Sequence, residues 1–193
     1  MNLSAPFLHS HFSENDQMTE KHLDFSYTCP CCGELKTGLP VLGFSTPLGL
    51  PSSSDEEKDD LGDMRDDVYV DRGTSDRFVR CVMSMTIIGL STALEWSVWV
   101  SLSETNFTRY RDSYASGMQA RLGPMFGWLC SWSPDYPGDG LVKCRVHPRD
   151  GRLRPLIEIE PTDHPLSQDM QNGITLDRAI MLATPWLEIL HAK

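Results

Sequence analysis

Basic residues are scarce in this chain of 193 residues. It has 17 lysines and arginines against 27 aspartates and glutamates, which gives a formal net charge of −10 at pH 7 and a pI near 4.9. Nucleic acids and anionic membranes are bound through a positive surface, so the bulk charge argues against both as partners. The acidic excess is local, because residues 55–76 carry ten acidic and three basic side chains, a balance of −7.

Long apolar runs are missing as well. No stretch is apolar over the length needed to span a bilayer, and the first residues lack the basic and apolar regions of a secretory signal peptide. We therefore expect a soluble, cytoplasmic protein. Its six cysteines are then expected to be mostly reduced thiols, with Cys81, Cys130 and Cys144 packed among apolar neighbours.

The composition nevertheless predicts a folded domain. Hydrophobic residues make up 40% of the chain and aromatic residues 9%, which is too apolar for global disorder. Residues 1–24 have no sustained periodicity and are predicted to be a mobile leader. Residues 25–193 are predicted to form one domain, with an acidic surface loop at about 41–67 where Gly, Pro and Ser are followed by acidic residues.

Hydrophobic alternation predicts a sheet built from hairpins. Residues 94–103 alternate strictly between apolar and mainly polar side chains, as in a half-buried strand. Residues 68–70 and 78–88 are β-rich and flank turn residues, and residues 141–147 and 153–160 form a second such pair. We expect an α+β fold with an antiparallel sheet, a helix after the central strand and a C-terminal helix packed on one face.

Two helices follow from spacing and capping residues. Ser101 with Glu104 three residues later is a candidate capping box. Phe107, Tyr110, Tyr114 and Met118 follow at helical spacing, until glycines between 117 and 123 disrupt the pattern. Thr175 is placed to cap a C-terminal helix in which Pro185 produces a kink or a new turn.

Several sequence blocks resemble a known family. They occur in this order: Cys29-Pro30-Cys31-Cys32-Gly33-Glu34, Gly38-Leu39-Pro40, residues 98–107, residues 126–129 and residues 154–166. Over roughly residues 27–190 the chain resembles the bacterial family labelled domain of unknown function 2199. The resemblance implies a small cytosolic protein without an established reaction. Members often carry His, Cys and Gly near the positions of Lys36, Tyr69 and Cys81, so metal-competent positions of the family are substituted here.

The most specific motif for a metal is a single Cys-x-x-Cys. Cys29 and Cys32 have the spacing that lets two thiolates bind one Zn²⁺, but no second such pair and no paired histidines follow. A reduced turn without metal is the first expectation, and zinc is the only cofactor that the sequence suggests.

The residues of a catalytic site are incomplete. Asp163 and His164 could act as an acid–base pair beside a pocket near Trp99 and Trp128, yet no nucleophile motif accompanies them. The simpler expectation is that Asp163 caps a short helix and that His164 forms a local hydrogen bond.

A basic patch on the second predicted hairpin has two interpretations. Lys143, Arg145 and nearby arginines could bind a phosphate or an acidic partner. Alternatively, Lys143 and Arg145 face Glu158 and Glu160 across the hairpin, which stabilises the strand pair.

These observations favour a non-enzymatic protein that binds a protein partner, with a basic partner favoured, as inhibitor or immunity-type proteins do. A small enzyme of unknown reaction and a zinc-stabilised module are the alternatives. The acidic run and exposed loop aromatics supply the expected contact residues, which are Asp59, Asp60, Asp66, Asp67, Trp132 and Tyr136.

Overall fold

The computed structural model describes residues 26–29, 32–44, 46–47, 66–71, 73–130, 136 and 141–191, with side chains as far as residue 186. The predicted leader 1–24 and most of the predicted acidic loop lie outside these residues. The strands are β1 (Ser26–Thr28), β2 (Leu35–Thr37), β3 (Leu42–Gly43), β4 (Val68–Val70), β5 (Arg77–Thr86), β6 (Ala93–Leu102), β7 (Met125–Leu129), β8 (Val142–His147) and β9 (Leu156–Ile159). The helices are α2 (Glu104–Tyr114), the 3₁₀ helix η2 (Gln119–Leu122), α3 (Pro165–Asn172) and α4 (Leu176–His191).

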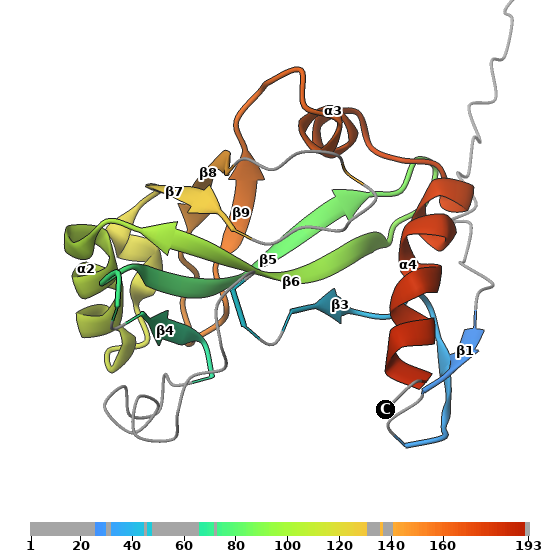
Figure 1. Cartoon of the computed structure of the whole chain (residues 1–193), viewed down its shortest axis with the longest axis horizontal. Coiled ribbons are helices and arrows are strands. Elements are labelled where there is room, and N and C mark those ends of the chain that lie inside the picture. Colours follow the sequence, from blue (N-terminus) through green and yellow to red (C-terminus); the bar gives the residue numbers. More distant parts are fainter. Residues whose placement is uncertain are drawn as a thin grey trace, which may run out of the picture.

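The central strands close into a barrel (Figure 1). From β5 to β9, each strand pairs antiparallel with the next, and β5 and β6 pair along their full length. The barrel closes where β9 meets β5 in parallel, with Val82 N–H donating to the Pro155 carbonyl at 2.8 Å. The α+β class and both hairpins are confirmed, and the sheet is mixed because β3 also pairs parallel with β6.

The two faces of β6 are less different than its alternation suggests. Glu95 is exposed, but Ser97 and Trp99, on the predicted polar face, are buried. Trp99 packs with Tyr69 and Phe78 in a small aromatic cluster separate from the barrel interior. The expectation of a half-buried strand therefore holds only for the first part of β6, because outer aromatic residues cover the second part.

Glycine is required at one position of the barrel wall. A Cβ atom on Gly127 would lie 2.4 Å from Val100 Cγ1 and 3.1 Å from the Ser101 carbonyl oxygen. Such a contact forces packed atoms apart. The glycine inside the aromatic run of β7 therefore lets β7 approach β6.

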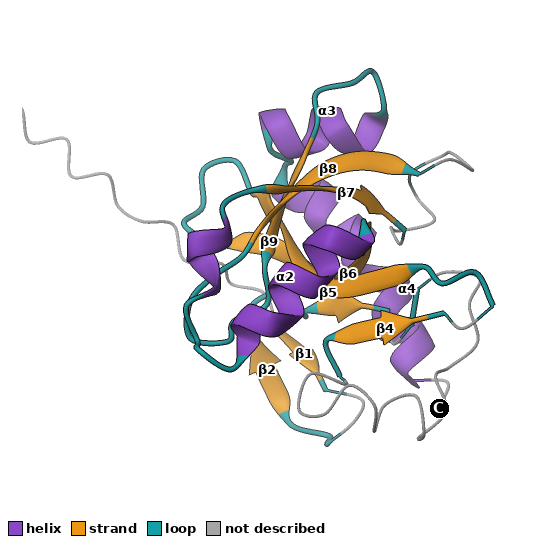
Figure 2. Cartoon of the chain, turned by 90° about the vertical axis from the view of Figure 1, so that its left-hand side faces the viewer, coloured by secondary structure: helices purple, strands orange, loops and turns teal. Residues whose placement is uncertain are grey.

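Helix α2 lies across the end of the barrel that faces the viewer in Figure 2. Phe107 and Tyr110 are its buried residues and belong to the main core. Its N-cap is Ser103, whose hydroxyl accepts a hydrogen bond from Asn106 N–H at 3.3 Å. The predicted cap at Ser101 is wrong, because β6 continues through that residue and the helix begins only at Glu104.

Helix α4 lies at the opposite end of the molecule (Figure 1). Thr175 caps it as predicted, since its hydroxyl accepts from Arg178 N–H at 3.2 Å. Pro185 lies within the helix. The ring of Trp186 meets that of Phe44 edge-on at 4.8 Å, which ties α4 to the segment after β3. Among the described residues, none of the helices is both long and apolar enough to cross a membrane.

Candidate functional site

The outward face of β7, β8 and β9 carries aromatic, cationic and acidic side chains in three neighbouring columns. We call this surface the ladder face, and it consists of Phe126, Trp128, Lys143, Arg145, Glu158 and Glu160.

Strand register aligns these columns. Phe126 pairs with Arg145, and Arg145 pairs with Glu158 on the next strand. Trp128 pairs with Lys143 in the neighbouring row. The alternation of the strands turns all of these side chains outward, because their neighbours in β7, β8 and β9 point into the barrel.

The aromatic column is partly open to solvent. Phe126 is 46% exposed although it lies within a strand. Its ring contacts Trp128 edge-on, with centroids 5.4 Å apart. Lys143 Nζ lies 5.8 Å from the Trp128 ring centroid, within cation–π range. Exposed aromatic residues beside cations are typical of protein-binding surfaces.

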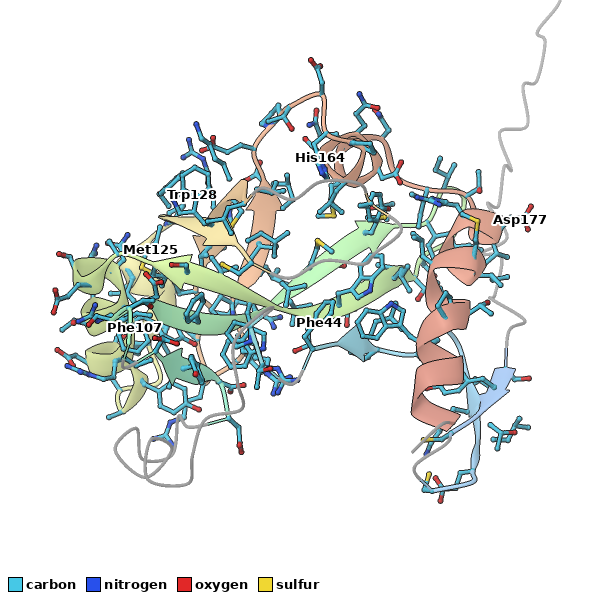
Figure 3. The ribbon with its side chains drawn as sticks, in the orientation of Figure 1. Phe44, Phe107, Met125, Trp128, His164 and Asp177 are labelled. Atoms are coloured by element: carbon cyan, nitrogen blue, oxygen red, sulfur yellow. The ribbon has the colours of Figure 1, made fainter. Side chains whose placement is uncertain are left out.

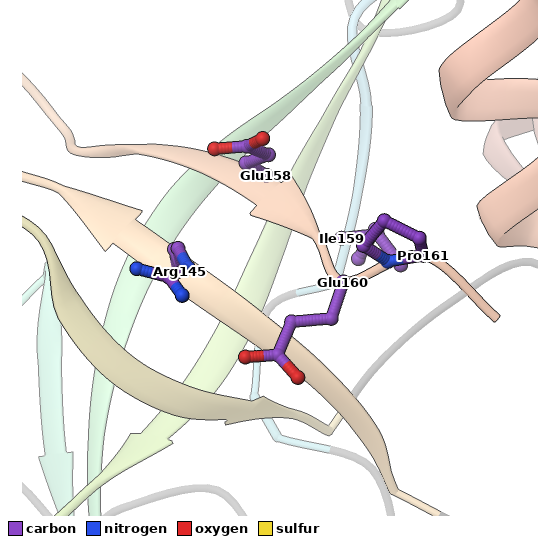
Figure 4. A pocket seen from close by; sticks show the side chains of 5 residues that line it. All are labelled: Arg145, Glu158, Ile159, Glu160 and Pro161. Atoms are coloured by element: carbon purple, nitrogen blue, oxygen red, sulfur yellow. The ribbon is translucent and has the colours of Figure 1, made fainter.

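A surface pocket of about 280 Å³ lies between the cationic and acidic columns, and its side chains are shown in Figure 4. It is lined by Arg145, Glu158, Ile159, Glu160 and Pro161. The register confirms that Arg145 faces Glu158, but the carboxylate of Glu158 is paired with His147 Nε2 at 3.2 Å. Within the described part of the chain, the Arg145 guanidinium forms no hydrogen bond or ion pair.

The other cations of the predicted basic patch have structural contacts. Arg149 donates to the Arg154 carbonyl at 2.7 Å, and Arg154 forms an ion pair with Asp67 at 2.6 Å. Arg152 donates to the Ala115 carbonyl and lies over the Tyr114 ring. These groups are directed to different partners, so they do not form one anion-binding cluster.

The acidic contact residues fall into two groups. Asp59 and Asp60 lie outside the described residues, whereas Asp66 is exposed and Asp67 is half-buried. The ion pair with Arg154 and a hydrogen bond from Arg80 N–H to the Asp67 carbonyl, at 2.8 Å, anchor Asp67 to the barrel. Asp67 is therefore a structural residue within the acidic stretch 55–76.

The turn between β4 and β5 uses another aspartate. Asp71 accepts hydrogen bonds from the backbone N–H groups of Gly73 and Thr74, both at 2.8 Å. The bond from Thr74 is the main cause that lowers the pKa of Asp71. The predicted turn chemistry of this hairpin is thus present in the structure.

Trp99, Trp128 and His164 have three different environments. Trp99 is buried, its Nε1–H donates to the Phe44 carbonyl at 3.2 Å, and Arg80 lies over its ring. Trp128 lies on the outer face of β7, and Figure 3 shows it and His164 on separate elements. The ladder-face pocket contains none of the three residues that we assigned to a pocket.

His164 itself caps α3. Its Nδ1 accepts a hydrogen bond from Leu166 N–H at 3.2 Å, and Pro165 occupies the first helical position. The prediction that Asp163 is the cap is wrong by one residue. Because Nδ1 acts as an acceptor here, the ring contributes to local structure.

Tyr136 is not the exposed loop residue that we expected. It is only 2% exposed, and its hydroxyl donates to Asp169 Oδ2 at 2.8 Å. Arg178 lies 5.3 Å from its ring centroid and Met85 contributes a sulfur contact. The turn-rich sequence around Tyr136 does not indicate the direction of its side chain, and the structure places the ring against Asp169 of α3 and Arg178 of α4. Trp132 lies outside the described residues.

The cysteine motif forms the turn between β1 and β2. Cys29 N–H donates to the Glu34 carbonyl at 2.8 Å, and Gly33 N–H donates to the Cys29 carbonyl at 2.7 Å. Gly33 has φ of +73°, which favours glycine. In the described ranges, no group of three or more His, Cys, Asp and Glu residues could hold a metal ion. Cys29 and Cys32 therefore supply at most two ligands there.

Comparison with known proteins shows to which family the chain belongs. Residues 28–174 match the family described as "Uncharacterized protein conserved in bacteria (DUF2199)". The chain belongs to this DUF2199 family. No curated protein and no solved structure matches it.

The DUF2199 match begins in β1 and ends just before α4. It therefore includes the cysteine turn, the whole barrel and the ladder face. The resemblance found in the sequence blocks is confirmed, and the family description assigns no reaction to these surfaces.

Proposed function

We propose that this DUF2199 protein is a non-enzymatic interaction protein that binds a basic protein partner through its acidic segment, residues 55–76, as inhibitor or immunity-type proteins do. One observation carries the proposal: this segment holds −7 of the formal net charge of −10. A concentrated negative field accelerates encounter with a basic surface and selects against acidic partners.

The described residues of the segment support this assignment. Asp67 is held by Arg154, so the segment enters the barrel at a fixed point. Asp66, next to this anchor, is exposed. Asp76, the last residue of the turn before β5, is exposed as well. Carboxylates beside a rigid anchor lose less conformational entropy on binding than those on a free tail.

Charge reversal tests the segment directly. We expect the triple variant Asp59→Lys, Asp60→Lys and Asp66→Lys to slow association with a basic partner recovered from the host lysate by at least about tenfold at low salt. Asp67 is left unchanged because its loss would remove the anchor. The measurement is the association rate constant by stopped flow at low and high ionic strength.

The matched control reverses three acids elsewhere. Glu95, Asp112 and Asp163 are exposed and lie outside the segment, and their replacement by Lys changes the net charge equally. This control should associate much faster than the segment variant. Equal rates for the two variants would assign the effect to bulk charge, and a wild-type rate for the segment variant would contradict the proposal.

The cysteine turn supports a second proposal, a structural zinc ion at Cys29 and Cys32. Its backbone hydrogen bonds fix a tight turn around the two residues. Two further ligands would come from elsewhere in the chain or from a second copy.

Metal analysis of the full chain tests this zinc site. The zinc proposal predicts bound zinc in protein purified without chelators, and its loss in the variant Cys29→Ser with Cys32→Ser. Cys130→Ala, which alters a thiol on the barrel, is the matched control and should keep the metal. Wild-type protein free of zinc would remove this second proposal.

A further inference from the structure

We propose that the ladder face binds the ladder face of a second copy of this chain, which gives a twofold-symmetric dimer. The observation is the order of the columns: Arg145 on β8 pairs with Glu158 on β9, and Lys143 lies beside Glu160, the residue that follows β9. An isologous interface requires a surface that is complementary to itself, and adjacent columns of opposite charge have this property.

The charges determine the geometry of the contact. A twofold axis that passes between β8 and β9 places the cationic column of each copy against the acidic column of the other. This axis runs along the strands and keeps the rows, so Arg145 of one copy lies opposite Glu158 of the other and one row from Glu160. Because the carboxylate of Glu158 is already paired with His147, the guanidinium of Arg145 pairs with the carboxylate of Glu160, and the reciprocal contact forms by symmetry. Arg145 forms no ion pair within the described residues of its own chain, and Arg–carboxylate pairs are strong when they are bidentate.

We place the contact between Arg145 and Glu160 at the pocket between the two columns. It lies on the proposed axis, is lined by Arg145, Glu158 and Glu160, and has a volume of about 280 Å³. That space accommodates a guanidinium group entering from the opposite copy. Pro161 adds an apolar wall beside the ion pairs.

The aromatic column flanks the same contact. Phe126 is 46% exposed and its strand neighbour Trp128 is half-buried, so both rings have apolar area to bury. Aromatic and arginine side chains are the residue types most enriched at interfaces. The small size of the face predicts a weak dimer, with a dissociation constant in about the micromolar range.

Sedimentation velocity on the full chain over a range of concentrations tests the dimer. We expect wild-type protein to dimerise, and both Arg145→Glu and Glu160→Arg to raise the dissociation constant at least about tenfold. In each variant the reciprocal contacts become like-charged. Both side chains are on the surface, and circular dichroism verifies that the variants are folded.

Mixing the two folded variants is the decisive measurement. In the mixed pair both contacts join an arginine to a glutamate, so an equimolar mixture should dimerise although each variant alone is monomeric. Glu95→Arg, on another face of the barrel, is the control and should dimerise like the wild type. A monomeric wild type, dimerisation of the single variants at wild-type strength, or a monomeric mixture would each overturn the proposal.

Discussion

Replacing Tyr136 with alanine is expected to lower the free energy of unfolding by about 3–5 kcal/mol, the typical cost of deleting a buried aromatic side chain. Tyr136 is 2% exposed and packs against the main core. Its removal leaves a cavity beside Met85 and takes a hydrogen-bond donor from Asp169. Urea denaturation followed by tryptophan fluorescence and circular dichroism measures the change.

Tyr136→Phe separates packing from hydrogen bonding. This variant keeps the ring and loses only the bond to Asp169, so we expect about 1–3 kcal/mol of destabilisation. Arg178, 3.7 Å from the Asp169 carboxylate, partly compensates. If Tyr136→Ala changed stability by less than Tyr136→Phe, the ring of Tyr136 would not be packed in the core.

Alkaline pH is expected to destabilise the protein through its buried thiols. Burial raises the pKa of Cys81 well above the usual value of 9.0, that of Cys144 to about 12 and that of Cys130 to about 11. Between pH 9 and the raised pKa values, these thiols therefore stay protonated in the folded state and lose their protons in the unfolded chain. Stability is independent of these groups below pH 9 and falls as pH rises from 9 towards the folded pKa values.

The expected magnitude follows from the number of thiols. One pH unit above the unfolded pKa, each thiol lowers the free energy of unfolding by about 1.4 kcal/mol. The three thiols together lower it by about 4 kcal/mol at pH 10. Urea denaturation under reducing conditions between pH 8 and pH 10 measures this decline. Burial also raises the pKa values of Tyr110 and Tyr136, which adds to the loss at still higher pH.

Cys144→Ala provides the control for the pH dependence. The variant is less stable at every pH because a buried side chain is shortened, but its decline between pH 8 and pH 10 should be about one third smaller. A wild-type stability that stays constant or increases over this range would contradict the burial of these thiols.

Features that depend on neighbouring residues were predictable from the sequence. The Asp71 turn follows from the preference of aspartate for backbone N–H groups, and the Thr175 cap follows from the same kind of local bond. The errors at Ser101 and Asp163 were displacements by one or two residues. Each real cap, Ser103 or His164, is adjacent to the first helical residue, and the position of that residue is not fixed by the capping preference alone.

The candidate site was only partly predictable. Alternation in residues 142–147 placed Lys143 and Arg145 on one face, and the hairpin placed Glu158 opposite Arg145. The position of Phe126 beside Arg145 requires the pairing of β7 with β8, whose register the connecting loop does not specify. The sequence therefore does not predict the exposure of Phe126, and it predicts an exposed Tyr136 although the structure buries that ring.

The sequence by itself determined the family, the α+β class, the two hairpins and the concentration of acid in residues 55–76, because all of these depend on residue types and on short-range periodicity. Only the tertiary structure decided that β9 closes the barrel against β5, that Trp99 and Tyr136 are buried, and that three columns of side chains form one outer face. These properties depend on contacts between residues far apart in the chain, and such contacts are selected by the packing of the whole core rather than by any local preference.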